Sequence, residues 1–327
     1  MAVIDVHTHM LTEEYLGFLA EHGGPKYELK PTKAGQNSIY MQDAPFMTLK
    51  PEMWNYDARI RDMDEAGVDL AIVSLTCPNA FFGDESISVR AARMVNDSMN
   101  EQQCARPDRI AWFASIPWQH ADVAVAELER ATGAGAIGVM VVASIDGARL
   151  TDSAFDPVWQ AIDDRGLPVL VHPTAPPGML DMDLDEFGLV PPVGFMIDTT
   201  LAVSRMILSG FFDRFPNLKI IASHGGATLP YLAGRLDRCH EMIPACAEAI
   251  SDKPSSYLER IYYDTVVYSQ DALDLCLKVG GIDNVLYGSD YPHNIGDMSG
   301  CLARVNSLDV RVASKVRDGN AKRIFGI

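Results

Sequence analysis

The stretch "VIDVHTHM", residues 3–10, places two histidines two positions apart at the end of an apolar, β-branched run. Side chains alternate along a strand, so His7 and His9 should project from the same face. Two neutral imidazoles at one point indicate a shared cation, which is a common reason for pairing histidines. The alternative is a pair of unrelated surface histidines, and this stretch alone does not decide between the two.

Seven further runs share this apolar character with the first run at residues 2–9. They lie at residues 68–76, 110–118, 136–144, 167–173, 218–226, 260–267 and 284–292. Nearly continuous hydrophobicity is typical of parallel strands that are buried on both faces. Amphipathic helical stretches separate the runs; residues 199–216 read as one helix that Pro216 stops. Eight strands alternating with helices predict one α/β domain over residues 1–327, a (β/α)8 TIM barrel.

Two long insertions interrupt this alternation. Residues 22–56 follow the first strand, and the Pro- and Gly-rich residues 174–197 follow the fifth strand. Long segments of this kind usually form lids or binding loops, or else are disordered. Both should lie at the C-terminal mouth of the barrel, where TIM-barrel active sites lie. Their apolar residues are predicted to exclude water from the site: Phe46, Met47, Trp54, Phe187 and Phe195.

Composition excludes several classes of partner. The net charge of −17 repels nucleic acid and anionic lipid, although a local cationic pocket could still bind a small anionic substrate. No stretch of ~18 uninterrupted apolar residues occurs, so no membrane span is predicted. The six cysteines form no CxxC pair, and the N-terminus has no signal-peptide pattern. Both observations favour a reducing, cytoplasmic location.

Polar residues follow three later strands at the same predicted end of the barrel. His172 ends strand five, His224 ends strand six and Asp290 ends strand eight. Strand ends at the barrel mouth are where ligands can converge. His7, His9, His172 and Asp290 would provide three nitrogens and one oxygen for a single divalent metal, with a water in an open position. Asp264, in "YYDT", either supports this site or has a structural role at its strand end.

The chain resembles the amidohydrolase superfamily, specifically the branch typified by 2-amino-3-carboxymuconate-6-semialdehyde decarboxylase. The resemblance covers nearly the whole chain, with "DVHTH" (5–9), "FPNLKIIASHGG" (215–226), "YGSDYP" (287–292) and "GNAKRIFGI" (319–327) among its blocks. It implies that His7, His9, His172 and Asp290 are the metal ligands. Zinc is the usual ion; some relatives use manganese, several of which replace the first histidine with glutamate. Because both histidines are kept here, the resemblance and ligand softness favour Zn²⁺, with Mn²⁺ as the alternative.

The resemblance also implies that His224 is the catalytic histidine beside a metal-bound water, acting as acid and base. Gly225 and Gly226 follow it and are predicted to leave space above the metal, which favours the base role. The alternatives for His224 are a fifth ligand or a packing residue. Asp290 is implied in catalysis as well as in metal binding.

Four residues are predicted to bind substrate. Lys50 stands at the position of an arginine that binds a substrate carboxylate in that branch. Lysine can pair with a carboxylate, but it cannot make the two parallel hydrogen bonds that a guanidinium makes. Trp54 matches the family tryptophan, whereas Pro191 stands where a pocket tryptophan is expected. Arg235 matches an arginine that reaches the neighbouring subunit's site, which implies a homodimer or higher homo-oligomer; alternatively it is a surface arginine. His293 is predicted to line the pocket.

The leading functional prediction is a metal-dependent, non-oxidative decarboxylase of a small unsaturated or aromatic carboxylic acid. A metal ion would stabilise the charge that develops as the C–C bond breaks. The alternative is a hydrolase or hydratase acting on a lactone, an amide or a conjugated acid, because the same scaffold supports both chemistries. A non-enzymatic barrel would lack some ligands, and none is missing from this sequence.

Overall fold

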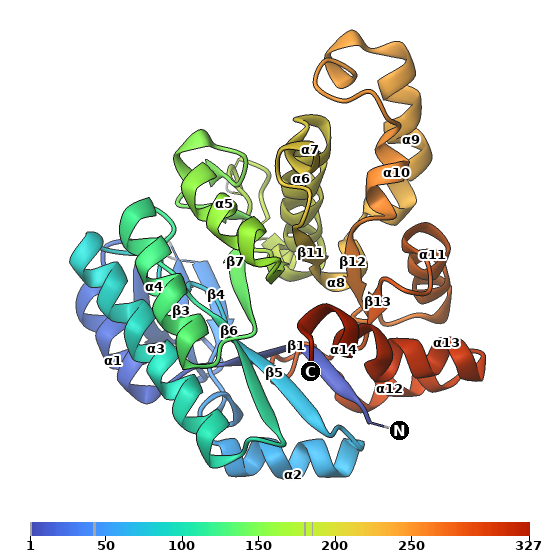
Figure 1. The fold of residues 1–327 in the computed structure, drawn as a ribbon. Coiled ribbons are helices and arrows are strands. Elements are labelled where there is room, and N and C mark those ends of the chain that lie inside the picture. The colour runs from blue at the N-terminus through green and yellow to red at the C-terminus, as the bar shows by residue number, and fades with distance from the viewer. Residues whose placement is uncertain (1, 42–43, 180, 185) are drawn as a thin grey trace.

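The eight-stranded barrel is confirmed. The computed structural model describes residues 2–41, 44–179, 181–184 and 186–327. The strands pair in parallel in the order β1-β5-β6-β7-β10-β11-β12-β13, and helices surround them (Figure 1). Their bounds are β1 Ile4–Met10, β5 Leu70–Leu75, β6 Ile110–Ala114, β7 Gly138–Val142, β10 Pro168–His172, β11 Lys219–Ala222, β12 Tyr262–Asp264 and β13 Val285–Leu286. Each predicted run therefore contains one strand.

The barrel closes between its first and last strands. Because β13 is short, the residues that follow it make most of the contacts to β1. The N–H of Val6 donates to the carbonyl of Tyr287 at 3.0 Å, and the N–H of Asp290 donates to the carbonyl of His7 at 2.8 Å. Thr8 and Tyr291 form a parallel bridge one step further along. This seam brings residues from opposite ends of the chain into one site.

Helices cover the outside of the barrel. The main ones are α1 Glu13–His22, α2 Tyr56–Ala66, α3 Glu85–Ala105, α4 Ala121–Ala134, α5 Asp156–Arg165, α6 Phe195–Leu208, α7 Phe211–Arg214, α9 Leu229–Met242, α10 Pro254–Leu258, α11 Gln270–Gly280, α12 Met298–Asn306, α13 Val310–Ser314 and α14 Asn320–Phe325. The single helix predicted over 199–216 is wrong: Gly210, at φ 70°, separates α6 from α7. None of the helices in the described ranges is long and apolar enough to cross a membrane.

The two insertions differ in structure. Residues 22–56 contain an antiparallel sheet of β2 Tyr27–Pro31, β3 Asn37–Met41 and β4 Ala44–Thr48, so this insertion is not an irregular loop. The second insertion contains two short turns, Glu186–Gly188 and Val190–Gly194, before α6 begins. A small hairpin, β8 Ser144–Ile145 and β9 Ala148–Arg149, follows β7. Residues 42, 43, 180 and 185 of the predicted lids lie outside the described residues.

The close spacing of barrel strands generates a stability prediction. A Cβ added at Gly138, in β7, would lie 2.7 Å from the carbonyl oxygen of Pro168 and 2.8 Å from the Phe113 ring. Gly138→Ala should therefore destabilise the fold by about 1–3 kcal/mol through overpacking. Gly133→Ala is the matched control, because nothing lies within 4 Å of that Cβ; in an exposed helix it should stabilise by about 0.5–1 kcal/mol. Urea unfolding curves measure both, and equal midpoints would contradict the prediction.

Candidate metal centre

Two histidines of β1 and one carboxylate of the β13 loop meet at the barrel mouth. His7 Nε2 lies 3.0 Å from His9 Nε2, and Asp290 Oδ1 lies 3.4 Å from the first and 3.2 Å from the second. Atoms that each lie ~2.0–2.1 Å from one zinc ion are roughly 3.0–3.4 Å from one another. The spacing of these three atoms therefore fits coordination of a single ion.

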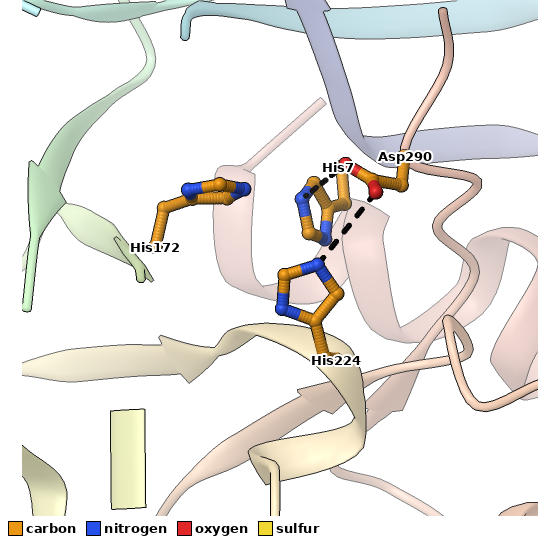
Figure 2. A group of neighbouring side chains, drawn as sticks. All are labelled: His7, His172, His224 and Asp290. Atoms are coloured by element: carbon orange, nitrogen blue, oxygen red, sulfur yellow. Dashed lines mark ion pairs between the residues drawn. The ribbon is translucent and has the colours of Figure 1, made fainter. Parts of the chain in front are cut away.

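Two further histidines face the same point. His7, His172, His224 and Asp290 each offer one ligand atom, and these atoms lie within 4.8 Å of one another; Figure 2 shows their side chains pointing toward a common centre. Nδ1–H of His172 donates to the carbonyl of Pro173 at 2.8 Å, which directs Nε2 inward. That Nε2 is buried and has no hydrogen-bond partner within the described part of the chain. A bound cation would satisfy it, so the residues fit a metal.

Hydrogen bonds fix the ring orientation of the β1 histidines. Nδ1–H of His7 donates to Asp264 Oδ2 at 2.6 Å. Nδ1 of His9 bonds Ser74 Oγ at 3.0 Å, and Ser74 lies on the neighbouring strand β5. Both rings thus turn Nε2 toward the centre, as histidine ligands do when a carboxylate or hydroxyl holds their other nitrogen. Of the two roles open for Asp264, the structure supports the one at the site.

The electrostatic environment suits metal ligation. Burial lowers the pKa of His9 to about 3 and lowers the pKa of His172 well below its usual range, so both present a neutral lone pair. Burial also acts to lower the pKa of His7, but Asp264 and Asp290 raise it to about 10, so a cation would have to displace a proton from His7 on binding. Burial acts to raise the pKa of Asp290, but the neighbouring imidazoles of His224, His7 and His9 outweigh it and hold the pKa well below its usual range. The carboxylate is therefore ionised at neutral pH.

His224 lies on a strained turn that Asp264 supports. Its backbone is left-handed, with φ 56°, a costly conformation for a residue with a side chain. Asp264 accepts the N–H groups of His224 at 2.8 Å and Gly225 at 2.9 Å, which offsets this cost. Nε2 of His224 lies 3.7 Å from Asp290 Oδ2. The side chain therefore lies beside the ligand cluster without an ordinary hydrogen bond to it.

The predicted reason for the two glycines after His224 is wrong. A Cβ at Gly225 would lie 2.2 Å from a Val267 methyl group, and one at Gly226 would lie 2.6 Å from the Tyr263 ring. Both missing side chains therefore face the neighbouring strand and its loop, and they do not open space above the ligands. The glycines allow the tight turn that presents His224, since both also have positive φ.

A cavity of about 250 Å³ extends from the ligand cluster. Both insertions line it, together with residues that follow the barrel strands. The lining residues are Phe46, Met47, Thr48, Thr76, Cys77, His172, Gly188, Pro191, Phe195, His224, Asp290, His293, Asn294 and Ile295. Three of the five predicted water-excluding side chains are among them. Phe187 is 93% exposed and is not one of them.

The four residues predicted to bind substrate do not all lie at one site in the structure. His293 lines the cavity, and its Nε2 bonds Thr76 Oγ1 at 3.0 Å. Lys50 lies behind it, with Nζ donating to the carbonyl of His293 at 3.5 Å. Trp54 lines a different cavity beside β2 and β3, whereas the preceding Met53 is fully buried. Arg235 is exposed on α9, which projects from the barrel (Figure 1).

Sequence reasoning missed several supporting residues, among them Ser74 and Gly288. Ser74 orients His9, and Gly288 makes room for the pair formed by His7 and Asp264: a Cβ at Gly288 would lie 2.8 Å from the Cβ of His7. The available signals were a serine inside an apolar strand and a glycine just before "SDYP". Neither signal identifies a partner until the strands are placed side by side.

This barrel and its ligand cluster define a metal-dependent TIM-barrel enzyme. The chain belongs to the amidohydrolase family, since the family model described as "Amidohydrolase" matches residues 4–327. It is 25% identical, over 332 residues, to 2-amino-3-carboxymuconate-6-semialdehyde decarboxylase of Dictyostelium discoideum, covering 99% of this chain and 91% of that protein.

Solved structures extend the comparison. 5-Carboxyvanillate decarboxylase from Sphingomonas paucimobilis has a TM-score of 0.87 and 28% identity, covering 100% of this chain and 99% of its own. Dihydroxybenzoic acid decarboxylase from Polaromonas sp. JS666, solved with bound manganese and the inhibitor 2-nitroresorcinol, has a TM-score of 0.82 and 25% identity. The alignment covers 99% of this chain and 97% of the Polaromonas chain. The resemblance stated from the sequence is confirmed.

A buried carboxyl beside the site gives the chain a pH-dependent stability. Asp198, on α6, is 3% exposed, and its Oδ2 accepts the N–H of Thr174, two residues after His172. Burial raises the pKa of Asp198 from 3.8 to about 7. A raised carboxyl pKa means that the folded state favours the proton, so this stabilisation is fully present below pH 3.8 and is lost as pH rises through about 7.

Asp198→Asn should therefore stabilise the fold at pH 8 and change it little at pH 4, since asparagine keeps the acceptor without the charge. One pH unit of pKa difference is worth about 1.4 kcal/mol, so the gain is at most about 4 kcal/mol. Urea unfolding of both proteins from pH 4 to pH 8 measures it. Asp181→Asn, on the exposed part of the second insertion, is the control. Parallel pH profiles for wild type and Asp198→Asn would refute the prediction.

Proposed function

We propose that this chain is a metal-dependent, non-oxidative decarboxylase of a small aromatic carboxylic acid, with His7, His9, His172 and Asp290 holding one divalent cation. One observation carries the proposal: inward-facing imidazole nitrogens and an ionised carboxylate converge at the end of a cavity of about 250 Å³. A cavity of this size suits a single substituted ring. The named activities of the relatives support the same reaction class.

The bound cation would supply Lewis-acid stabilisation of the negative charge that develops on substrate oxygens. Decarboxylation breaks the bond between the carboxyl carbon and the ring, and its electron pair stays on the ring carbon. That carbon must then take up a proton, which replaces the carboxyl group. His224 lines the cavity beside the ligand cluster, and its buried Nδ1 has no hydrogen-bond partner among the described residues. We assign proton delivery to His224.

The two insertions serve as lids on a single catalytic domain. Phe46 and Met47 come from the first insertion and Phe195 from the end of the second, and all three line the cavity. Apolar walls at these positions exclude water, which strengthens the electrostatic contacts of a bound carboxylate. Decarboxylation is preferred over hydrolysis or hydration because the similar proteins are named as decarboxylases.

Substrate contacts fall into two groups. His293 and Thr76 offer neutral hydrogen-bonding groups at the cavity wall, while Lys50 holds the His293 backbone and adds positive charge nearby. Arg235 makes no hydrogen bond or ion pair within the residues that the structure describes. Because α9 projects outward, Arg235 would reach the active site of a second copy of the chain and bind an anionic substrate there. This proposal includes a homodimer.

The identity of the ion and the compartment complete the proposal. Three imidazoles and one carboxylate favour zinc by ligand softness, whereas the Polaromonas relative binds manganese. We propose Zn²⁺ as the resident ion and Mn²⁺ as the alternative. The six cysteines are unpaired, including the buried Cys77, Cys276 and Cys301, which suits a reducing cytoplasm.

Removal of the metal should abolish carbon dioxide release. Protein purified without added metal is expected to contain about one zinc or manganese per chain by mass spectrometry. Activity on a panel of hydroxybenzoic and carboxyvanillic acids, measured as carbon dioxide release, should fall on chelation and return with one equivalent of ion. Full activity without metal, or a hydrated or ring-opened product in place of carbon dioxide, would refute the proposal.

Two variants should separate proton delivery from metal binding. His224→Ala is expected to retain the ion and lower kcat by ~10²–10⁴-fold, the usual contribution of a positioned acid or base. Asp290→Asn should instead weaken metal affinity, because it removes the charged ligand. Metal content, circular dichroism and kcat together test both. Loss of the ion from a folded His224→Ala variant would make His224 a ligand and overturn its assignment.

A further inference from the structure

A buried arginine lies directly behind the metal ligands. Arg59, in the first turn of α2, is fully buried. Its Nη1 donates to Thr8 Oγ1 at 2.6 Å, and its Nη2 donates to the carbonyl oxygen of His9. Thr8 lies between the two ligand histidines of β1. The guanidinium therefore binds the segment His7–His9 through the backbone carbonyl of His9 and the side chain of Thr8.

The same guanidinium also contacts the opposite side of the barrel seam. It stacks on the Tyr291 ring at 4.9 Å, and Tyr291 directly follows the ligand Asp290. The carbonyl of Tyr291 accepts hydrogen bonds from Thr8 Oγ1 at 3.1 Å and from the N–H of His9 at 2.7 Å. The hydroxyl of Tyr291 donates to Asp62, one turn beyond Arg59 on α2. One side chain thus joins the two segments that bear three of the four proposed ligands.

Arg59 is expensive to bury. Within the described residues no carboxylate forms an ion pair with it, and its Nε has no hydrogen-bond partner. Asp5 and Asp62 act on its charge from a distance but form no ion pair with it. Burying a charge without a directly paired counter-charge is unfavourable, and apolar replacements of buried charges are often neutral or stabilising. Fold stability alone therefore gives a poor account of an arginine here. Its contacts would instead fix the distance between His9 and Asp290.

We propose that Arg59 is a positioning residue for the metal centre: by binding residues 8–9 and Tyr291 together, it sets the separation of the β1 and β13-loop ligands. The inference rests on the metal site of the proposed function. It predicts that metal affinity and coordination geometry depend on Arg59 more than the stability of the fold does.

The test uses four variants of the full chain. Arg59→Met removes the hydrogen bonds and the charge, Arg59→Lys keeps the charge, and Thr8→Val removes one acceptor. Arg61→Met is the matched control, since Arg61 is an exposed residue of the same helix. For each, the Kd of Zn²⁺ and of Co²⁺ is measured by competition with a chromophoric chelator. The visible spectrum of the Co²⁺ form reports geometry, and urea unfolding with excess chelator reports stability.

Arg59→Met should raise the Kd by about 10–100-fold, the usual effect of losing a group that supports metal ligands, and should change the Co²⁺ spectrum. Arg59→Lys should recover part of the affinity, Thr8→Val should lose less, and Arg61→Met should match wild type. The unfolding midpoint of Arg59→Met with chelator should equal or exceed that of wild type.

Folded Arg59→Met with wild-type Kd and spectrum overturns the proposal, as does lost stability with unchanged affinity. If Arg59→Met does not fold, wild-type Kd values in both Arg59→Lys and Thr8→Val overturn it. A wild-type chain that binds neither ion would instead refute the proposed function itself, and this inference with it.

Discussion

The carboxylate of Asp264 is the contact on which the site depends. It accepts Nδ1–H of His7 at 2.6 Å and the backbone N–H groups of His224, Gly225 and Val266 at 2.8–3.0 Å. Burial opposes ionisation, but His7 holds the pKa of Asp264 below its usual value. One fully buried group thereby orients a proposed metal ligand and supports the strained turn that presents the proposed proton donor.

A second buried carboxyl group, Asp5, forms a similar set of hydrogen bonds at the seam of the barrel, although burial raises its pKa to about 7. Asp5 accepts the hydroxyl of Ser289 at 2.5 Å and the N–H groups of Ser289 and His7 at 3.1 Å. Asp5 lies two residues before the proposed ligand His7, and Ser289 lies one residue before the proposed ligand Asp290. The proposed ligands are thus supported by hydrogen-bonded carboxyl groups on two strands, Asp5 on β1 and Asp264 on β12. Such polar networks give a site a single geometry when each member is satisfied.

The sequence predicted the barrel well because each strand is marked by continuous apolar residues and each site residue stands near the C-terminal end of such a run. His7, His9, His172, His224 and Asp290 were found in this way, and the structure brings them together. The pattern could not show that Gly210 would divide a helix, because glycine is compatible with both outcomes. It also could not place Trp54, since a side chain in an insertion can face either of two cavities. Arg59 gave no signal, because a helix-surface arginine and a buried one look alike in sequence.

The closure of the barrel by its own ligand-bearing segments also governs how the enzyme is made. Thr8 and Tyr291, which meet in the seam, are 283 residues apart in the chain. During synthesis, one edge of β1 stays unpaired until β13 and the residues after it have been made. Contacts between residues so distant in sequence form late. The proposed metal site, which takes residues from both sides of this seam, is therefore complete only after the barrel has closed.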